Sequence, residues 1–178
     1  MPANIEIKAK LKDRSKALAT AATLADSGPE TIQQEDVFFH SDGARLKLRI
    51  LDPTHGELIR YHREDRAEIR RSHYILARTP DPETLRRILA ETLGIIGAVK
   101  KTRTLYLAGP TRIHIDQVEG LGDFLEFEVV LSEGQDDEDG KRIANELLAK
   151  FEIGHEALLA KAYIDMLQEP ELPGTKSS

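Results

Sequence analysis

The chain contains no cysteine, which excludes disulfide bonds, zinc–thiolate centres, iron–sulfur clusters and a cysteine nucleophile. Tryptophan is also absent and only 5% of the residues are aromatic, so stacking platforms for bases or sugars are scarce. No apolar run reaches the roughly 18 residues that a membrane-spanning helix needs. A basic excess is lacking too. Lysine and arginine number 25 against 31 aspartates and glutamates, which argues against a general binder of nucleic acids or membranes.

The length of 178 residues suits one domain with a proper core. We expect residues 1–168 to form this domain and residues 169–178, with their prolines and small polar groups, to be a disordered tail. Residues 1–11 contain no apolar segment of the kind found in secretory signals. With 31% charged and 40% hydrophobic residues, the composition predicts a soluble, cytoplasmic globular protein.

Apolar residues recur at helical spacing in four stretches, near residues 13–26, 81–93, 137–151 and 155–168. The second stretch has a clear start, because Asp81 suits an N-cap and Pro82 suits the first helical position. An acidic run at residues 133–139 invites a metal-site interpretation. We favour a structural role for it, because carboxylates in the first turn of a helix are stabilised by the helix dipole.

Most of the remaining chain alternates between apolar and charged residues with a period of two, as antiparallel strands with one apolar face do. The alternation is clear at residues 4–12, 45–51, 111–118 and 124–131, and weaker at 33–39, 57–63, 70–77 and 99–107. Two glycines within residues 119–123 predict a hairpin turn between two of these strands. The pattern therefore predicts an α+β chain of about eight strands and four helices.

The charged strand faces allow two folds. Glu126 and Glu128 stand on one face and repel each other unless water screens them or a cation bridges them. The same-face pairs Lys47 with Arg49 and Lys101 with Arg103 could bind an anion between them. If helices cover the apolar face of an open sheet, these charges face solvent. If the strands close into a barrel, the charges line a wet interior, because buried charge must be paired or solvated.

A series of short motifs follows the order of the strands. They lie at Asn4–Lys8, Gln34–Phe39, Leu46–Arg49, Leu58–Arg63, Lys101–Arg103, Ile115–Glu128 and Tyr163–Leu167. The motif at Ile115–Glu128 is the most specific, because it combines an aspartate, an E-G-L-G turn and an E-x-E pair. In this order the motifs resemble those of the CYTH superfamily, the triphosphate tunnel enzymes that include class IV adenylate cyclases and thiamine triphosphatases. Asn4 stands where the family's opening E-x-E-x-K motif has its first glutamate.

The resemblance implies an eight-stranded antiparallel β-barrel, a tunnel with a charged interior flanked by about four helices. It implies that basic side chains hold a triphosphate and that carboxylates hold Mg2+ or Mn2+. The triphosphate-binding residues would be Lys8, Lys47, Arg49, Arg63, Lys101 and Arg103, with Lys8, Arg63 and Lys101 acting in catalysis. The metal ligands would be Glu6, Asp116, Glu126 and Glu128.

Three functions stay open at this point. Hydrolysis of a small-molecule triphosphate (a nucleoside triphosphate, inorganic triphosphate or thiamine triphosphate) is favoured, because water is always available as the nucleophile. The alternative is an adenylate cyclase that converts ATP to cyclic AMP and pyrophosphate, which would bind the phosphates with the same residues. A non-catalytic polyphosphate or nucleotide binder is the third, because Asn4 removes one negative charge from the acidic cluster. We favour the view that the four remaining carboxylates suffice for one metal. No nucleic acid or membrane partner is expected, and a homodimer is left open.

Overall fold

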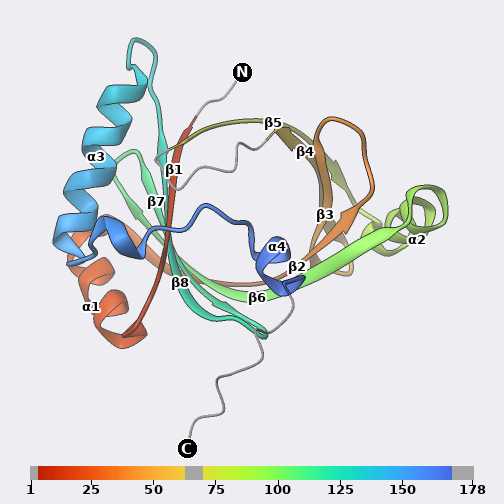
Figure 1. Ribbon diagram of the computed structural model, residues 1–178, viewed down its shortest axis with the longest axis horizontal. Coiled ribbons are helices and arrows are strands. Elements are labelled where there is room, and N and C mark those ends of the chain that lie inside the picture. Colours follow the sequence, from red (N-terminus) through yellow and green to blue (C-terminus); the bar gives the residue numbers. More distant parts are fainter. Residues whose placement is uncertain (1–3, 63–69, 170–178) are drawn as a thin grey trace, which may run out of the picture.

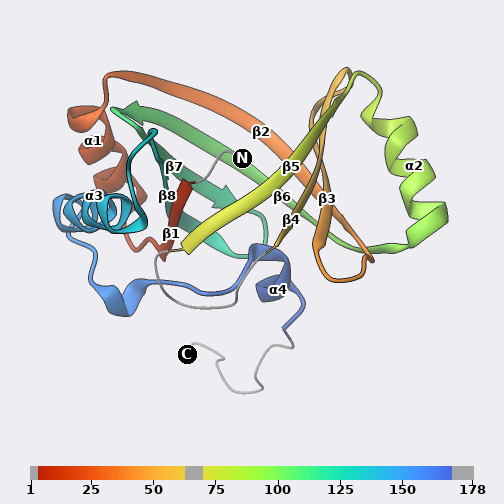
Figure 2. The ribbon, with the colours of Figure 1, turned by 90° about the horizontal axis from the view of Figure 1, so that it is seen from above.

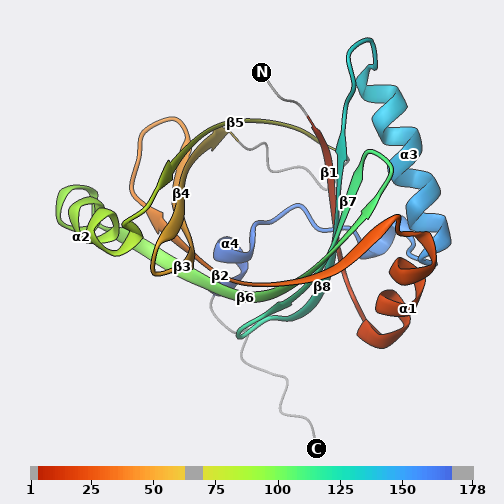
Figure 3. The same cartoon turned by 180° about the vertical axis from the view of Figure 1, so that it is seen from behind.

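The computed structural model describes residues 4–62 and 70–169, and its strands form a ring with the longer helices outside it (Figures 1 and 3). The strands are β1 (Asn4–Lys10), β2 (Ser27–Phe39), β3 (Arg45–Asp52), β4 (His55–His62), β5 (Arg70–Thr79), β6 (Ile95–Ala108), β7 (Thr111–Val118) and β8 (Gly122–Val130). The helices are α1 (Arg14–Leu24), α2 (Pro82–Leu93), α3 (Asp137–Lys150) and α4 (Tyr163–Leu167), with a 3-10 turn at His155–Ala157.

The eight strands close into an antiparallel barrel in the order β1-β5-β4-β3-β2-β6-β7-β8. The ring joins the first strand to the last: β1 pairs with β8 along its whole length, from Asn4 to Lys10. On its other side β1 pairs with β5 only at Asn4, Ile5 and Glu6. The barrel prediction is therefore confirmed. Within the described residues, the pairing of β1 with β5 is the shortest strand pairing of the barrel.

The apolar strand faces point outward and are covered by helices, as the barrel alternative requires. Ile5, Ile113 and Phe127 belong to a buried cluster that packs against α1 and α3 (Figure 2). On the other side of the ring, Val37, Phe39 and Leu48 are buried with apolar side chains of α2. Every second residue of these strands therefore faces the barrel interior, where the charged positions lie.

Two helix starts follow from local chemistry that the sequence predicts. The Asp81 side chain accepts a hydrogen bond from the backbone N–H of Thr84, and Pro82 is the first residue of α2. At α3, Asp136 and Asp139 accept hydrogen bonds from each other's backbone N–H groups, which forms a capping box. The acidic run is thus the start of a helix. Gly140 lets α3 approach β1, because a Cβ there would lie 2.4 Å from Cγ1 of Ile5.

The prediction of one helix over residues 155–168 was wrong. The segment forms the turn His155–Ala157 and the separate helix α4, with extended chain between them. That chain bonds to β1: Leu158 bridges Ala9, and the backbone N–H of Leu159 donates to the carbonyl oxygen of Lys8. The segment then leads into α4, which lies across one end of the ring (Figure 1). Among the described residues, no helix has both the length and the apolar character to cross a membrane.

Candidate functional site

The interior of the barrel holds a cavity of about 500 Å³. All eight strands contribute inward-facing side chains to its wall, and Tyr163 of α4 contributes at the end that this helix covers. The wall is uneven in character. Acidic and basic groups dominate the side formed by β1, β2, β3, β6, β7 and β8. β4 and β5 add the apolar and aromatic side chains Ile59, Tyr61, Tyr74 and Leu76, together with the charged Glu57 and Arg78.

A first cluster of charges joins β2 to β3. The Asp36 carboxylate accepts hydrogen bonds from Lys47 Nζ at 2.7 Å and from Arg49 Nε at 3.0 Å. Gln34 Nε2 donates to the same carboxylate at 3.1 Å. Burial alone would raise the pKa of Asp36, but the charges of Arg49 and Lys47 hold that pKa well below its usual range. The carboxylate is therefore ionised and serves as the counter-ion of both cations.

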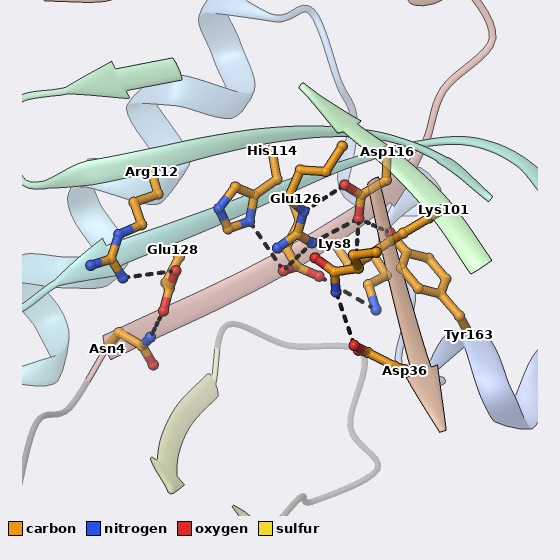
Figure 4. A network of polar contacts seen from close by, with 12 residues as sticks. Asn4, Lys8, Asp36, Lys101, Arg112, His114, Asp116, Glu126, Glu128 and Tyr163 are labelled. Atoms are coloured by element: carbon orange, nitrogen blue, oxygen red, sulfur yellow. Dashed lines mark hydrogen bonds and ion pairs between the residues drawn. The ribbon is translucent and has the colours of Figure 1, made fainter. Parts of the chain in front are cut away.

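A second cluster joins β6 to β7 with the same plan. Asp116 accepts hydrogen bonds from Lys101 Nζ at 3.0 Å and from Arg103 Nε and Nη2, each at 2.7 Å (Figure 4). The Tyr163 hydroxyl donates to it at 3.1 Å. Asp116 is completely buried, and although burial raises its pKa, the charges of Arg103 and Lys101 lower that pKa overall. Lys101, Arg103 and Tyr163 all act as donors, so the oxygens of Asp116 are occupied by protein groups.

Glu126 of β8 lies at the meeting point of three basic side chains. Its carboxylate oxygens are 3.5 Å from Lys8 Nζ, 3.3 Å from Arg103 Nη2 and 3.4 Å from His114 Nδ1. Burial raises the pKa of Glu126, but Lys8 and the hydrogen bond from His114 lower it overall. Burial, together with the nearby charge of Arg103, lowers the pKa of His114. Lys8 Nζ also lies 3.9 Å from the centre of the Tyr163 ring, within reach of a cation–π interaction.

Glu128 lies apart from Asp116, near the end of the cavity where β1 begins (Figure 4). It faces Glu6 directly across the β1–β8 pair, and side chains at such positions lie about 5 Å apart. Arg112 Nη1 donates to Glu128 at 3.2 Å, and Asn4 Nδ2 donates to its other carboxylate oxygen. The Oδ1 atom of Asn4 is buried, and the structure gives it no hydrogen-bond partner among the described residues.

These observations test whether the residues fit a divalent metal ion. Within residues 4–62 and 70–169, no three histidine, aspartate or glutamate side chains gather closely enough to form a ready-made metal site. Magnesium needs less than that, since one or two carboxylates plus substrate phosphates and water commonly hold it. Glu6 and Glu128, with the buried Oδ1 of Asn4 nearby, supply oxygen donors of this kind. The contacts of Asp116 fit such a role less well.

The predicted basic residues are brought together. Lys8, Lys47, Arg49, Lys101 and Arg103 all line the cavity. The predicted acidic residues Glu6, Glu126 and Glu128 line it too, whereas Asp116 lies behind Lys101 and Arg103. Arg63 falls outside the described residues, so its assignment stays a prediction. The metal assignment also stays a prediction.

The sequence-based reasoning missed Asp36 and Tyr163 as parts of the site. Both lie within motifs that were recognised, but neither received a role. For Asp36 a signal existed: it shares strand parity with Gln34 and Phe38, both of which line the cavity. Tyr163 had no such signal, because the periodicity placed it inside a long helix rather than at the end of the barrel.

Comparisons with known proteins agree with this geometry. A family model described as the CYTH domain matches residues 2–163. A relative from Methanocaldococcus jannaschii, named "Putative adenylate cyclase MJ0240", is 26% identical over 170 residues, covering 91% of this chain and 97% of its own.

Two solved structures share the fold. The PH1012 protein of Pyrococcus horikoshii has a TM-score of 0.81 at 23% identity, covering 91% of this chain and 98% of its own. A Hippeastrum protein described as having a dominant triphosphatase activity has a TM-score of 0.61 at 15% identity, covering 91% of each chain.

Proposed function

This chain belongs to the CYTH family, and on that premise we propose that it is a divalent-metal-dependent enzyme that hydrolyses a small-molecule triphosphate. One observation carries the proposal: lysines and arginines from β1, β3 and β6 converge on one cavity of about 500 Å³ inside the barrel. The five lysines and arginines share three carboxylates, those of Asp36, Asp116 and Glu126, so an excess of positive charge remains that a polyanionic ligand would offset. A triphosphate is a compact ligand of high negative charge.

The phosphates would be held by Lys8, Lys47, Arg49, Lys101 and Arg103. Arginine suits this task because its planar guanidinium can donate two parallel hydrogen bonds to phosphate oxygens. Each of these five side chains already has a carboxylate partner in the ligand-free protein. The cations are therefore oriented before the substrate arrives, which reduces the entropy lost on binding.

The divalent ion would be Mg2+ or Mn2+, held by Glu6 and Glu128 with Glu126 adjacent and the Oδ1 of Asn4 within the same region. When bound, such an ion neutralises charge on the phosphate oxygens and so favours attack on phosphorus. In this arrangement Asp116 keeps Lys101 and Arg103 in place and is not a direct ligand.

The reaction itself asks little covalent chemistry of the protein, since phosphoryl transfer is mostly positioning and charge stabilisation. Water attacks the terminal phosphorus, and the bond between that phosphorus and the bridging oxygen breaks. The diphosphate leaves with the electron pair of the broken bond, and the water proton passes to solvent in the cavity. Lys8 and Lys101 stabilise the negative charge that grows on the phosphate oxygens, and they are the catalytic residues of the proposal.

A second candidate function, the formation of cyclic AMP from ATP, is favoured by the apolar side of the cavity. Ile59 and Tyr61 of β4 and Tyr74 and Leu76 of β5 face the phosphate-binding side. Leu76 is 38% exposed although it points into the barrel, so an apolar ligand group could still cover it. An adenosine would suit this wall, and the cyclase would then use the ribose 3′-hydroxyl to attack the α-phosphorus and release pyrophosphate.

One panel of assays separates these functions. The purified protein is incubated with ATP, inorganic triphosphate or thiamine triphosphate, each with Mg2+, Mn2+ or a chelator. Phosphate, pyrophosphate and cyclic AMP are measured in the same samples. Metal-dependent phosphate release without cyclic AMP supports hydrolysis, whereas equal amounts of cyclic AMP and pyrophosphate support the cyclase. Binding of triphosphate without any product would mean a non-catalytic binder and would overturn both enzymatic proposals.

A further inference from the structure

Asp36 is a buried acid in the middle of the phosphate-binding wall, where an additional negative charge should oppose the binding of an anion. It is only 4% exposed and lines the cavity. Its carboxylate contacts Lys47 and Arg49, both of which the proposed function assigns to phosphate binding. No carboxylate in such a place is needed for binding alone, so its presence requires an explanation.

The strand register supplies one. Arg49 of β3 lies directly opposite Asp36 of β2, and Arg103 of β6 lies directly opposite Asp116 of β7. In both cases a lysine stands two residues before the arginine, on the same face, and binds the same aspartate. The barrel wall thus contains the same unit twice, a Lys-x-Arg strand with an aspartate on its neighbour.

The contacts within each unit restrain the cations in the same way. Asp36 accepts from both Nε and Nη2 of Arg49, as Asp116 does from Arg103. A two-point contact of this kind fixes the plane of the guanidinium. Without it, Lys47 and Arg49 would be two like charges at neighbouring same-face positions, which repel each other.

We propose that Asp36 is a positioning residue of the triphosphate site, which keeps Lys47 charged and Arg49 oriented, as its counterpart Asp116 does for Lys101 and Arg103. This inference rests on the proposed function, since it assumes that these cations bind the triphosphate. Asp36 acts through Lys47 and Arg49 and need not touch the phosphates.

The electrostatic setting of Lys47 makes the inference measurable. Burial lowers the pKa of Lys47 to about 8, and Asp36 opposes this effect. The other charged groups that face Lys47 are Arg49 on its own strand and Lys101 of β6, and both lower the pKa further. Tyr61 of β4 lies beside it, with the centre of its ring 5.6 Å from Lys47 Nζ. Asp36 is thus the group that keeps Lys47 protonated near neutral pH.

The test measures the binding of inorganic tripolyphosphate by calorimetry, without divalent metal. The pH is varied from about 6 to about 10, so that the range includes the lowered pKa of Lys47 and approaches the ordinary pKa of lysine. In the unmodified protein we expect the affinity to fall as the pH rises through about 8. In Asp36→Asn we expect the affinity to fall at a pH about one unit lower or more, because Lys47 has lost its counter-ion. At pH 7 the binding of tripolyphosphate should be about tenfold weaker than in the unmodified protein. The ligand's own protonation is the same for every variant and cancels in the comparison.

Two controls make the result specific. Glu35→Gln removes a charge from the opposite face of β2, one residue away, and should leave both the affinity and its pH dependence unchanged. In a Lys47→Met background, the fall near pH 8 should be lost and Asp36→Asn should cause no further shift. A shift of the same size in that background would overturn the proposal, as would unchanged binding in Asp36→Asn.

If Asp36→Asn does not fold, Asp36→Glu decides the matter. It keeps the charge but moves the carboxylate, so the pH of the fall should stay near the unmodified value while binding weakens, and binding of undiminished strength would overturn the proposal. A failure of the proposed function is distinguishable, because the unmodified protein would then not bind tripolyphosphate at all. An NMR titration of the Lys47 side chain needs no phosphate: the pKa of Lys47 should be about 8 in the unmodified protein and stay near that value in Asp36→Glu, and a fall of about one unit or more in that variant would overturn the view that the charge of residue 36 keeps Lys47 protonated.

Discussion

Asn4 places an amide among charged side chains, and its two ends behave differently. The Nδ2 atom donates a hydrogen bond to Glu128, whereas the Oδ1 atom is buried and has no partner among the described residues. A buried acceptor without a donor is destabilising by about 1–3 kcal/mol. In the proposed metal site, a hard cation between Glu6 and Glu128 would give this oxygen a partner.

Glu128→Gln tests the proposed metal site at one of its carboxylates. We expect metal-dependent turnover to fall at least about tenfold, because the metal loses a charged donor. The free energy of unfolding should change by less than about 1 kcal/mol, since the lost ion pair joins Glu128 to Arg112, which is half exposed. Steady-state kinetics and urea unfolding without metal check the two effects. Loss of folding without metal would instead make Glu128 a structural residue.

Asn4→Glu restores the carboxylate of the family's opening motif. We expect the metal concentration at half-saturation to fall roughly tenfold, because a unit charge about 4 Å from another is worth about 1 kcal/mol even in water and the cation carries two charges. The metal-free protein should become less stable, since the new carboxylate faces Glu128 instead of donating to it. Manganese binding followed by electron paramagnetic resonance gives the affinity without an activity assay. An unchanged half-saturation point would place residue 4 outside the metal site.

We expect the main effect of Asp116→Asn to be a lower free energy of unfolding rather than a direct effect on catalysis. Removing one partner of a buried ion pair typically costs about 3–5 kcal/mol, because the other charges stay buried without a counter-ion. Here Lys101 and Arg103 would both be left in that state. Asp165→Asn, at a partly exposed pair with Arg45, should cost less than about 1 kcal/mol. Similar unfolding midpoints for the two variants would contradict this assignment.

At the scale of whole elements, the strands were predictable and the final helix was not. Alternation identified all eight strands, because each has one face against the helices and one in the barrel, and such a face repeats every two residues. Leu158, Leu159 and Ala162 have helical spacing, yet residues 158–162 are not helical, because Leu158 and Leu159 bind to the backbone of β1 and the chain then leads to α4. A contact with a strand 150 residues earlier overrides local periodicity, and no local pattern contains it.

The site was predictable to about the same extent as the fold. Strand alternation again gave the part that could be predicted, and long-range contacts decided the rest. Strand parity alone places Lys47 with Arg49, and Lys101 with Arg103, on one face of their strands, and the resemblance to the CYTH superfamily implied that this face points inward. Which carboxylate each cation meets depends on the cross-strand register, and the register is decided by turns and by packing along the whole barrel. For that reason the sequence pointed to Asp116 as a metal ligand, whereas in the fold it binds two cations and a tyrosine.

Arg45→Met tests how α4 is held at the end of the barrel. Arg45 Nη1 and Nη2 donate to the two oxygens of Asp165 at 3.1 and 2.8 Å, which joins β3 to α4. The pair is partly exposed, so we expect its loss to weaken the attachment by about 1 kcal/mol. Amide hydrogens of residues 163–168 should then exchange about fivefold faster, while those of β3 stay protected. Unchanged exchange in α4 would show that Tyr163 and the apolar contacts hold the helix without Arg45.

At the scale of the whole molecule, protein carboxylates neutralise only part of the charge of the phosphate-binding cations, whereas the ligand that the cavity suits is strongly negative. Five cations share Asp36, Asp116 and Glu126, which leaves an excess of two positive charges. The shared carboxylates allow these charges to be buried in a stable protein, and a triphosphate carries more negative charge than the excess can offset, so a divalent ion would offset the remainder. The need for metal is therefore expected to grow with the number of phosphates on the ligand.

The lowered pKa values of the buried lysines predict opposite pH trends for the stability of the protein and for the binding of its ligand. The pKa of Lys47 falls from 10.5 to about 8 on folding, and burial also lowers the pKa of Lys101. Between about pH 8 and pH 10 the unfolded chain therefore binds more protons than the folded chain, so the stability of the ligand-free protein should rise with pH. Above that range Tyr163, whose pKa burial raises, acts in the opposite direction. Urea unfolding at several pH values, alongside tripolyphosphate binding, checks both trends, and parallel changes would contradict them.

The pairing of β1 with β8 also determines when the barrel can close during synthesis. β1 leaves the ribosome first, but the partner that lies along its whole length ends at Val130. Contacts between segments so distant in sequence form slowly, because the entropy of closing a long loop must be overcome before they form. Until then the chain exposes strand edges that can pair with other chains. Translation rate and chaperone supply should therefore limit the yield of this protein, and a nascent chain that stops before β8 has no ring rather than a ring with one wall missing.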